Sequence, residues 1–316
     1  GLVSRVATFE EDSGLPLTLA NFANYYRLDI RTIFSKHSFS RLCVAAGVRE
    51  DFDEPMENAL TKALGRISAI DSRRWIRFLL NILPNLDNVD FGNLRPIEKR
   101  MLQMFYVTVW LKSAERWDSE EVLDNLYALS DSPVMLAELM EVLRYKYEHI
   151  DFIDEPVNLG FDCPLDLHCT YTRDQLLVAL DFMNPNSVRE GVKWLPEKQI
   201  DVLFVTLNKS DKHYSPTTMY NDYSINEELF HWQSQSTTTD TGSVGQRYIN
   251  HRKRGSKVLL FVREFRTDMA GAAPYTFLGT VNYVKHHGSR PMNITWKLDK
   301  PIPAKYLKKT NKLVVG

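Results

Sequence analysis

The chain has 316 residues, of which 44% are hydrophobic and 25% charged, which is typical of a soluble globular protein large enough for two domains. No apolar run reaches the roughly 18 residues of a membrane span, and the N-terminus shows no secretory signal. We therefore expect a cytoplasmic protein without a membrane partner. The three cysteines, Cys43, Cys163 and Cys169, are too few and too scattered for a disulfide framework and indicate buried thiols.

The formal net charge of −1 conceals an uneven distribution of charge along the chain. Residues 1–155 carry 18 Lys and Arg against 25 Asp and Glu, which gives −7. Residues 241–316 carry 15 against 3, which gives +12. This split favours a polyanionic partner for the C-terminal end and a different role for the N-terminal half. A solvated basic face without a ligand is the alternative.

Residues 1–152 are predicted to form an all-helical bundle that acts as a linker or coupler domain. Apolar residues recur with a spacing near 3.6 in six segments, namely 17–34, 59–70, 72–83, 95–114, 119–129 and 133–150. Start signals agree with three of them, since Ser72, Pro96 and Ser119 stand where helix caps and first turns are expected. No glycine-rich phosphate loop interrupts the pattern, so we expect no active site in this half.

The pattern changes after residue 152. One short helix is predicted at 172–182, and it is followed by four strand candidates rich in Val, Phe, Thr and Tyr: 201–207, 257–265, 275–284 and 292–298. Short strands in a module of this size indicate a small, strongly curved barrel or sheet with flanking helices over residues 153–316, and of the two we expect the barrel. The predicted fold class is therefore α+β, with a helical bundle followed by a barrel.

Signals for catalysis or metal binding are weak throughout. The sequence contains no nucleophile elbow, no Walker A loop and no dinucleotide fingerprint. His168 lies between Cys163 and Cys169, but this spacing does not match a zinc site and no second pair of ligands follows. His286 and His287 are adjacent on a predicted strand, so their side chains are expected on opposite faces. We expect no catalytic residue, no metal and no cofactor in this chain.

The segment at residues 214–255 combines aromatic rings, amide side chains and a basic cluster without a clean apolar period. Flat rings beside hydrogen-bonding groups and cations are what a nucleic-acid base-reading site requires. The predicted base-binding residues are Tyr220, Asp222, Tyr223, Trp232, Gln233 and Gln235. The predicted phosphate-binding residues are Arg247, His251, Arg252, Lys253 and Arg254.

An alternative applies to two of the aromatic residues in this segment. Residues 225–232 show helical spacing at Ile225, Leu229 and Trp232. If a helix forms there, Phe230 and Trp232 are core anchors and not ligands of a base. Tyr220 and Tyr223 stand among polar residues, which favours a functional role for them.

Residues 155 to about 313 resemble a C-terminal domain of unknown function found on bacterial superfamily 2 DNA helicases. The resemblance rests on stretches such as PLDLHCTYTRDQLLVAL, REGVKWLPEKQIDVLFVTLNKS, YSPTTMYNDYSINEELFHWQSQS and PYTFLGTVNYVKHHGSRPMNITWKL. The preceding helical part, with YYRLDIRTIFSKHSFSRLC, resembles the segment that joins such a domain to the helicase motor. Together they are similar to SauUSI-type, ATP-dependent, modification-dependent (type IV) restriction enzymes of phage defence.

The resemblance implies a function that the residues alone do not establish. In that group the C-terminal domain is compared with the SRA/PUA-like fold, a curved barrel that flips 5-methylcytosine or 5-hydroxymethylcytosine out of duplex DNA. The helicase and nuclease domains, with their ATP and Mg²⁺, would lie elsewhere in the same polypeptide, because this chain has neither motif. Two other functions stay open: a scaffold that couples a helicase motor to a partner, or an enzymatic domain of unknown chemistry.

Overall fold

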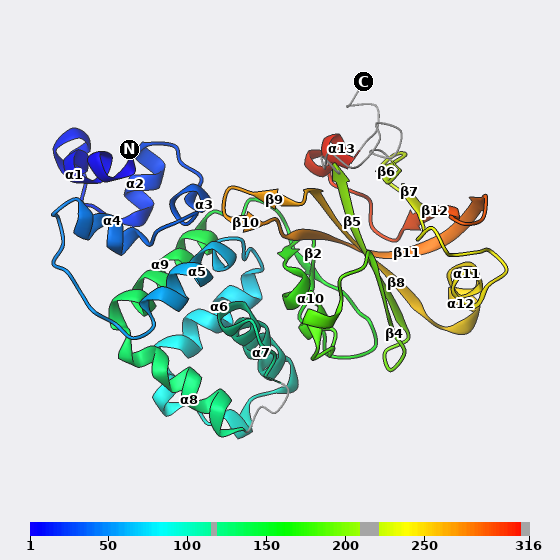
Figure 1. Cartoon of the computed structure of the whole chain (residues 1–316), viewed down its shortest axis with the longest axis horizontal. Helices are drawn as coiled ribbons and strands as arrows, with labels where there is room; N and C mark the ends of the chain where they lie inside the picture. Colours follow the sequence, from blue (N-terminus) through cyan, green and yellow to red (C-terminus); the bar gives the residue numbers. More distant parts are fainter. Residues whose placement is uncertain (115–118, 209–220, 311–316) are drawn as a thin grey trace. The chain divides into compact units, whose positions relative to one another are not determined.

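The computed structural model describes residues 1–114, 119–208 and 221–310, and its fold is mixed α+β (Figure 1). The chain divides into two compact units. Unit 1 comprises Gly1–Leu165, Cys169–Pro185 and Thr267–Ala272, and unit 2 comprises Asp166–His168, Asn186–Arg266 and Ala273–Gly316. The domain boundary that the sequence suggests after residue 152 stays a prediction.

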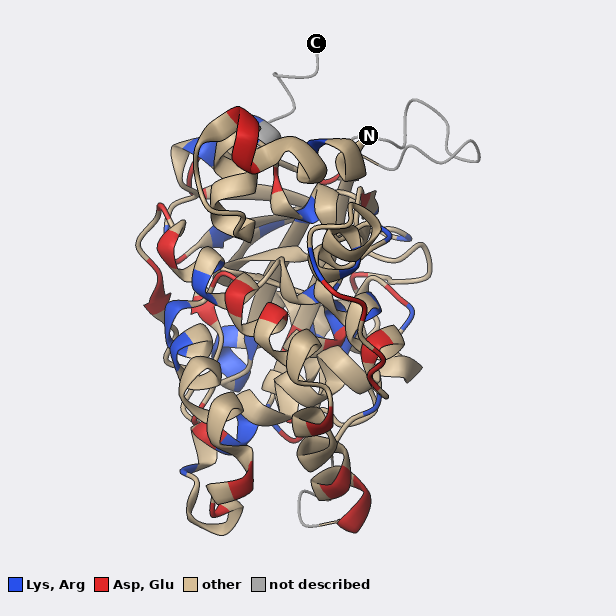
Figure 2. Cartoon of the chain, turned by 90° about the vertical axis from the view of Figure 1, so that its left-hand side faces the viewer, with Lys and Arg blue, Asp and Glu red and all other residues tan. Residues whose placement is uncertain are grey.

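Unit 1 is built mainly from helices, as the apolar spacing predicts (Figure 1). They are α1 Leu2–Ser13, α2 Leu19–Tyr25, α3 Ile30–Ile33, α4 Phe39–Ala45, α5 Glu57–Ile67, α6 Arg73–Ile82, α7 Pro96–Trp110, α8 Glu120–Ala128, α9 Pro133–Glu148 and α10 Arg173–Ala179, with 3₁₀ turns η1 Leu83–Asn88, η2 Phe91–Asn93 and η3 Leu129–Asp131. In Figure 2, acidic and basic residues are interspersed over these helices. None of the helices in the described ranges combines the length and apolar character that a membrane span requires.

The expected start signals lie where helices begin. The Ser72 hydroxyl accepts a hydrogen bond from the Trp75 amide, and the Ser119 hydroxyl accepts one from the Val122 amide. Pro96 occupies the first turn of α7, where its missing amide hydrogen costs nothing. The three local signals in the sequence are therefore confirmed.

Residues 17–34 form two helices, not the single helix that their spacing predicts. Arg27 adopts a positive φ of 54°, which ends the first helix, and the Asp29 carboxylate then accepts a hydrogen bond from the Arg31 amide as the cap of α3. Asp in a helical window favours a cap because its short side chain competes for backbone amides. The apolar period continues across this break and therefore hides it.

Helix α9 packs against α4, α5 and α6 and holds two further helix starts in place. The carboxylate of Glu138 is buried and accepts hydrogen bonds from the amides of Phe39 and Ser40 at 2.9 and 2.5 Å. Glu141 accepts a hydrogen bond from the Leu19 amide at 2.8 Å. Carboxylates stabilise helix N-termini, since the first amides have no partner within the helix.

Unit 2 contains a mixed, mostly antiparallel sheet in the order β4-β5-β8-β11-β12-β7-β6 (Figure 1). Its strands are β4 Val192–Leu195, β5 Ile200–Asn208, β6 Tyr223–Ser224, β7 Leu229–Gln233, β8 Lys257–Phe265, β11 Tyr275–His287 and β12 Asn293–Leu298. Neighbouring strands run antiparallel except β5 and β8, which are parallel. All four strands expected from the sequence are present, and the α+β class is confirmed.

The core of unit 2 lies on one face of this sheet. Alternate residues of β5, β8, β11, β12 and β7 point into it, and the short helices α11 Ser243–Ile249, α12 His251–Arg254 and α13 Ala304–Thr310 accompany the strands. Strand β11 carries irregularities after Phe277 and after Tyr283, and bulges of this kind bend a strand and increase its twist. On the other face of the sheet, Phe204, Phe261 and Phe277 are buried as well, while β12, β7 and β6 carry partly exposed polar residues there.

Candidate nucleic-acid interface

Strand β7 places its residues alternately on the two faces of the sheet. Phe230 and Trp232 are buried in the core of unit 2, whereas His231 and Gln233 are half-buried on the opposite face. This alternation is the period of a β-strand, and it rules out the helix that the spacing of residues 225–232 suggested. The core position that the alternative assigned to both aromatic residues is correct, the helix on which it was based is wrong, and the predicted base-binding role of Trp232 is not compatible with its burial.

Pairing with neighbouring strands assembles a mostly polar surface around His231, in which Leu229 is apolar. The register sets His231 opposite Thr295 of β12 and Tyr223 of β6, and it sets Gln233 opposite Asn293. Paired residues share a face because side chains alternate in step along antiparallel strands. We call this surface the outer face; its residues are Tyr223, His231, Gln233, Asn282, Lys285, His287, Asn293, Thr295 and Lys297.

Three rings form a row across the outer face. The rings of Tyr223 and His231 stack with centroids 4.8 Å apart and planes 19° apart. The next ring, that of His287 on β11, lies 6.1 Å from His231 at a tilt of 34°. The Nδ1 of His231 donates to the carbonyl oxygen of Asn221 at 2.6 Å, which fixes the orientation of the imidazole. Tyr223 and His231 already cover each other's faces, so a base can extend this row of π-systems by stacking at its ends.

Amides and cations surround the ring row. The side chain of Gln233 donates to the side chain of Asn293 at 3.3 Å, which holds the two amides side by side. Lys285 and Lys297 are exposed on the strands next to them. Amide groups can pair with the edges of bases, and lysines can pair with phosphates. The outer face therefore combines the three kinds of group that a nucleic-acid surface uses.

A polar pocket of about 680 Å³ adjoins the outer face. Asn282 and Lys297 belong to both, and Arg252, Glu228 and Asp299 complete its charged lining. The carboxylate of Asp299 already accepts a hydrogen bond from the amide of Asn282 at 2.8 Å. The pocket thus offers cations for phosphates and carboxylates for amino groups next to the ring row.

Asp222 and Gln235, which are also predicted to bind a base, make hydrogen bonds within the protein. Asp222 is 9% exposed, and its carboxylate accepts a hydrogen bond from the Gln233 amide at 2.8 Å, so it links the segment before β6 to the end of β7. Gln235 is half-buried, and its amide donates to the carboxylate of Glu190 at 3.1 Å, away from the ring row. Tyr220 lies outside the described residues.

Trp232 belongs to the core and not to a base pocket. It is 3% exposed and makes an edge-on contact with Tyr248, with ring centroids 5.4 Å apart, and a tilted contact with Trp296 at 6.2 Å. Because side chains alternate along a strand, the neighbours of Trp232 on β7 lie on the outward face. One of these neighbours is His231, which is not among the residues predicted from the sequence to bind a base.

Arg247 is engaged by an acid in place of a phosphate. Its guanidinium makes two hydrogen bonds to the carboxylate of Asp201, at 2.8 and 2.9 Å, and lies 4.3 Å from the centre of the Trp194 ring. The Asp201 side chain is 1% exposed. An arginine held in this way pairs with the charge of a buried carboxylate and has little capacity left for a ligand.

His251 is likewise structural. It is 2% exposed, its Nε2 accepts a hydrogen bond from the Tyr283 amide at 3.0 Å, and its Nδ1 donates to the carbonyl of Ser256 at 3.2 Å. This arrangement requires the neutral imidazole, because one ring nitrogen must act as an acceptor. Burial lowers the pKa of His251 in agreement with that requirement.

The remaining basic residues of α12 are exposed. Arg252 donates to the carbonyl of Tyr283 at 2.9 Å, while Lys253 and Arg254 follow it before the chain turns at Gly255, whose φ is 75°. Three crowded cations on the surface give a site where phosphates can be bound. Of the five phosphate-binding predictions, these three lie on the surface.

His286 and His287 point to opposite faces of β11, as expected from their adjacency. The Nδ1 of His286 is within 2.6 Å of the Tyr283 hydroxyl, and its Nε2 is 3.3 Å from the carboxylate of Asp240. His287 instead joins the ring row. The three cysteines are buried thiols, as expected.

Comparison with known proteins gives one family match. A model of a domain of unknown function (DUF3427) matches residues 165–309, which is less than half of the chain. The matched span contains every residue of the outer face, the pocket beside it and the basic end of α12. No curated protein matches the chain.

Proposed function

We propose that unit 2 is a DNA-binding specificity module that recognises a modified cytosine in duplex DNA. One observation carries the proposal: the row of Tyr223, His231 and His287, set between paired amides and exposed lysines on one sheet face. A base has two faces and a polar edge, and this surface offers partners for both. A base inside a duplex is hidden, so its recognition on a ring row requires that it be flipped out of the stack.

The choice of 5-methylcytosine or 5-hydroxymethylcytosine as the target rests on the resemblance to modification-dependent restriction enzymes. On the same basis we propose a closed, SRA/PUA-like barrel for unit 2, which is supported by its mostly antiparallel sheet with two irregularities in β11. The chain would then act without catalysis of its own in the cytoplasm. Helicase and nuclease domains of the same polypeptide would supply ATP-dependent cleavage.

The direct test compares the affinity of the full chain for duplexes that differ only in one cytosine. Fluorescence anisotropy with unmodified, 5-methylated and 5-hydroxymethylated duplexes of the same sequence, at fixed salt concentration, should show tighter binding of at least one modified duplex. Equal affinities across several sequence contexts would contradict the proposed specificity.

Substitutions in the row of rings distinguish recognition of the base from general binding of DNA. Tyr223→Ala and His231→Ala each remove a stacking surface and should weaken binding of the modified duplex by about 1–3 kcal/mol, whereas Tyr223→Phe keeps the ring and should retain most of the affinity. Phe265→Ala is the matched control, because Phe265 is an aromatic residue of unit 2 that is 47% exposed and lies on β8, away from the ring row.

Thermal stability must be measured on the same variants, since Tyr223 and His231 also contact each other. A variant that melts like the parent protein and loses affinity only for the modified duplex identifies a base contact. If both ring variants keep the full preference for the modified duplex, the outer face does not read the base.

A further inference from the structure

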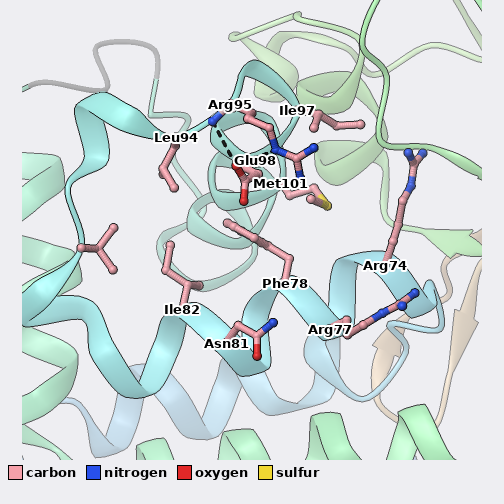
Figure 3. A pocket seen from close by; sticks show the side chains of 11 residues that line it. Arg74, Arg77, Phe78, Asn81, Ile82, Leu94, Arg95, Ile97, Glu98 and Met101 are labelled. Atoms are coloured by element: carbon pink, nitrogen blue, oxygen red, sulfur yellow. Dashed lines mark hydrogen bonds and ion pairs between the residues drawn. The ribbon is translucent and has the colours of Figure 1, made fainter.

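Unit 1 carries a groove of about 560 Å³ between α6 and the beginning of α7 (Figure 3). Apolar side chains from both helices and from their connection line it: Phe78, Ile82, Val89, Leu94, Ile97 and Met101. In Figure 3 the side chains of Phe78, Ile82 and Leu94 point into the space between the helices. The groove therefore combines an apolar floor with polar side chains, among them Asn81.

Part of the apolar lining lies outside the core of unit 1: Ile82 and Met101 are buried core residues, whereas Phe78, Val89, Leu94 and Ile97 are only partly buried. Helix α6 turns Trp75, Ile76 and Leu79 toward the interior, where all three are at most 1% exposed. Phe78 and Leu94 remain half-exposed on the groove side. A cluster of partly exposed apolar side chains in a concave surface is typical of a binding site for a partner.

Arginines mark the rim of the groove. Arg77 is exposed on α6, and the Arg95 side chain is 74% exposed at the start of α7. Arg74 stands one turn before Phe78 and reaches the carbonyl oxygens of Cys163 and Leu165 at 3.0 and 3.3 Å.

Glu98 supplies negative charge to the lining, and Arg95 pairs with it at 3.0 Å. The three arginines outweigh this carboxylate, so the rim carries a net positive charge.

We propose that this groove binds an acidic amphipathic helix of a protein partner. The apolar lining matches the leucine-like face of such a helix, with anchors one turn apart, and the arginines match carboxylates on its flanks. Nucleic acid fits less well, because sugar and phosphate would leave Phe78, Leu94 and Ile97 uncovered. The proposal concerns unit 1 alone and does not depend on the DNA-binding function of unit 2.

The test uses a fluorescein-labelled helical peptide as probe. Its leucines recur at i, i+3, i+4 and i+7, and glutamates occupy the other positions; two controls scramble the order or replace Glu with Lys. The full chain should bind the acidic peptide at least tenfold more tightly than either control. Absence of binding, or equal binding of the scrambled peptide, overturns the proposal.

Two variants test the groove itself. Arg77→Glu reverses a rim charge and should weaken the peptide by roughly fivefold to tenfold, while Arg144→Glu, an exposed arginine on α9, should leave it unchanged. Leu94→Ser removes an apolar contact without a change of charge and should also weaken the peptide. Leu15→Ser is its control, because Leu15 is 44% exposed elsewhere in unit 1.

Circular dichroism of each variant is the control that shows whether it is folded. If only the charge variant weakens the peptide, the arginines form a non-specific cationic patch and the proposal fails. If a DNA duplex displaces the peptide and Arg77→Glu weakens the duplex equally, the groove belongs to a nucleic-acid surface, which also overturns it.

Discussion

Replacing Arg247 with alanine distinguishes a buried ion pair from a phosphate contact. The sequence places Arg247 among the phosphate ligands, whereas the structure pairs it with Asp201 through two hydrogen bonds. The Asp201 side chain is 1% exposed and that of Arg247 is 16% exposed. Loss of the guanidinium would leave a carboxylate in the interior without its partner.

The expected cost is about 3–5 kcal/mol in the free energy of unfolding, the usual range when one partner of a buried ion pair is removed. The contact with Trp194, 4.3 Å from the guanidinium carbon, lies within that total and does not add to it independently. Arg247→Lys keeps the charge but loses the paired hydrogen bonds, so it should cost less. Arg252→Ala, an exposed neighbour, should cost about 1 kcal/mol or less.

The deficit should depend on pH in a defined direction. Burial raises the pKa of Asp201, and the hydrogen bonds from Arg247 oppose that rise. Without Arg247 the pKa rises further, so the folded variant takes up a proton more readily than the unfolded chain, whose carboxyl titrates near 3.9. A raised folded-state pKa favours the folded state at low pH and loses that effect as pH rises. The variant should therefore lose more stability at pH 7 than near pH 4.5, each measured against the parent protein.

Urea unfolding followed by circular dichroism gives the free energies, and hydrogen exchange with mass spectrometry locates the loss to β5 and α11. The dependence of DNA affinity on salt concentration tests the alternative, in which Arg247 contacts a phosphate. If Arg247→Ala unfolds like the parent and instead flattens the salt dependence by about 0.9 log units, then Arg247 is a phosphate ligand and the structural reasoning is refuted.

Three other outcomes follow from the same geometry. Since burial lowers the pKa of His251, stability should fall as pH drops below about 6.5, where the unfolded imidazole charges first; His251→Gln should blunt that loss in urea unfolding at pH 7.5 and 5.5. Gly245→Ala should cost about 1–3 kcal/mol in thermal unfolding, because the new methyl group would lie 2.0 Å from the carbonyl oxygen of Thr239. Replacing both Lys253 and Arg254 with alanine should weaken modified and unmodified DNA alike and reduce the salt slope by about 0.9 for each phosphate that the variant no longer binds; an unchanged slope would place the DNA elsewhere.

Helices and strands were largely predictable because their signals are local. Ser72 and Ser119 cap the helices that follow them, and the strand expected at 257–265 has those bounds in the structure. A cap needs only the next three residues, and a strand buried on both faces, like this one, is recognised from a short run of apolar and β-branched residues. The break at Arg27 was missed because apolar spacing continues across it while the backbone does not.

Within the candidate interface, the sequence by itself determined that residues 214–255 are rich in rings, amides and cations. Only the tertiary structure decided which of these groups face outward. Trp232 turns inward and His231 outward because β7 pairs with β12 in one register, and a shift by one residue would exchange them.

The basic residues show the same division between composition and position. Charge count alone treats Arg247 and Arg254 alike. Asp201, 46 positions before Arg247 in the sequence, engages the first, and the second stays exposed at the end of α12. The composition of a segment can be read from the segment alone. A buried partner or a shared face arises only when distant segments pack together. Packing therefore decides which residues are structural and which are available to a ligand.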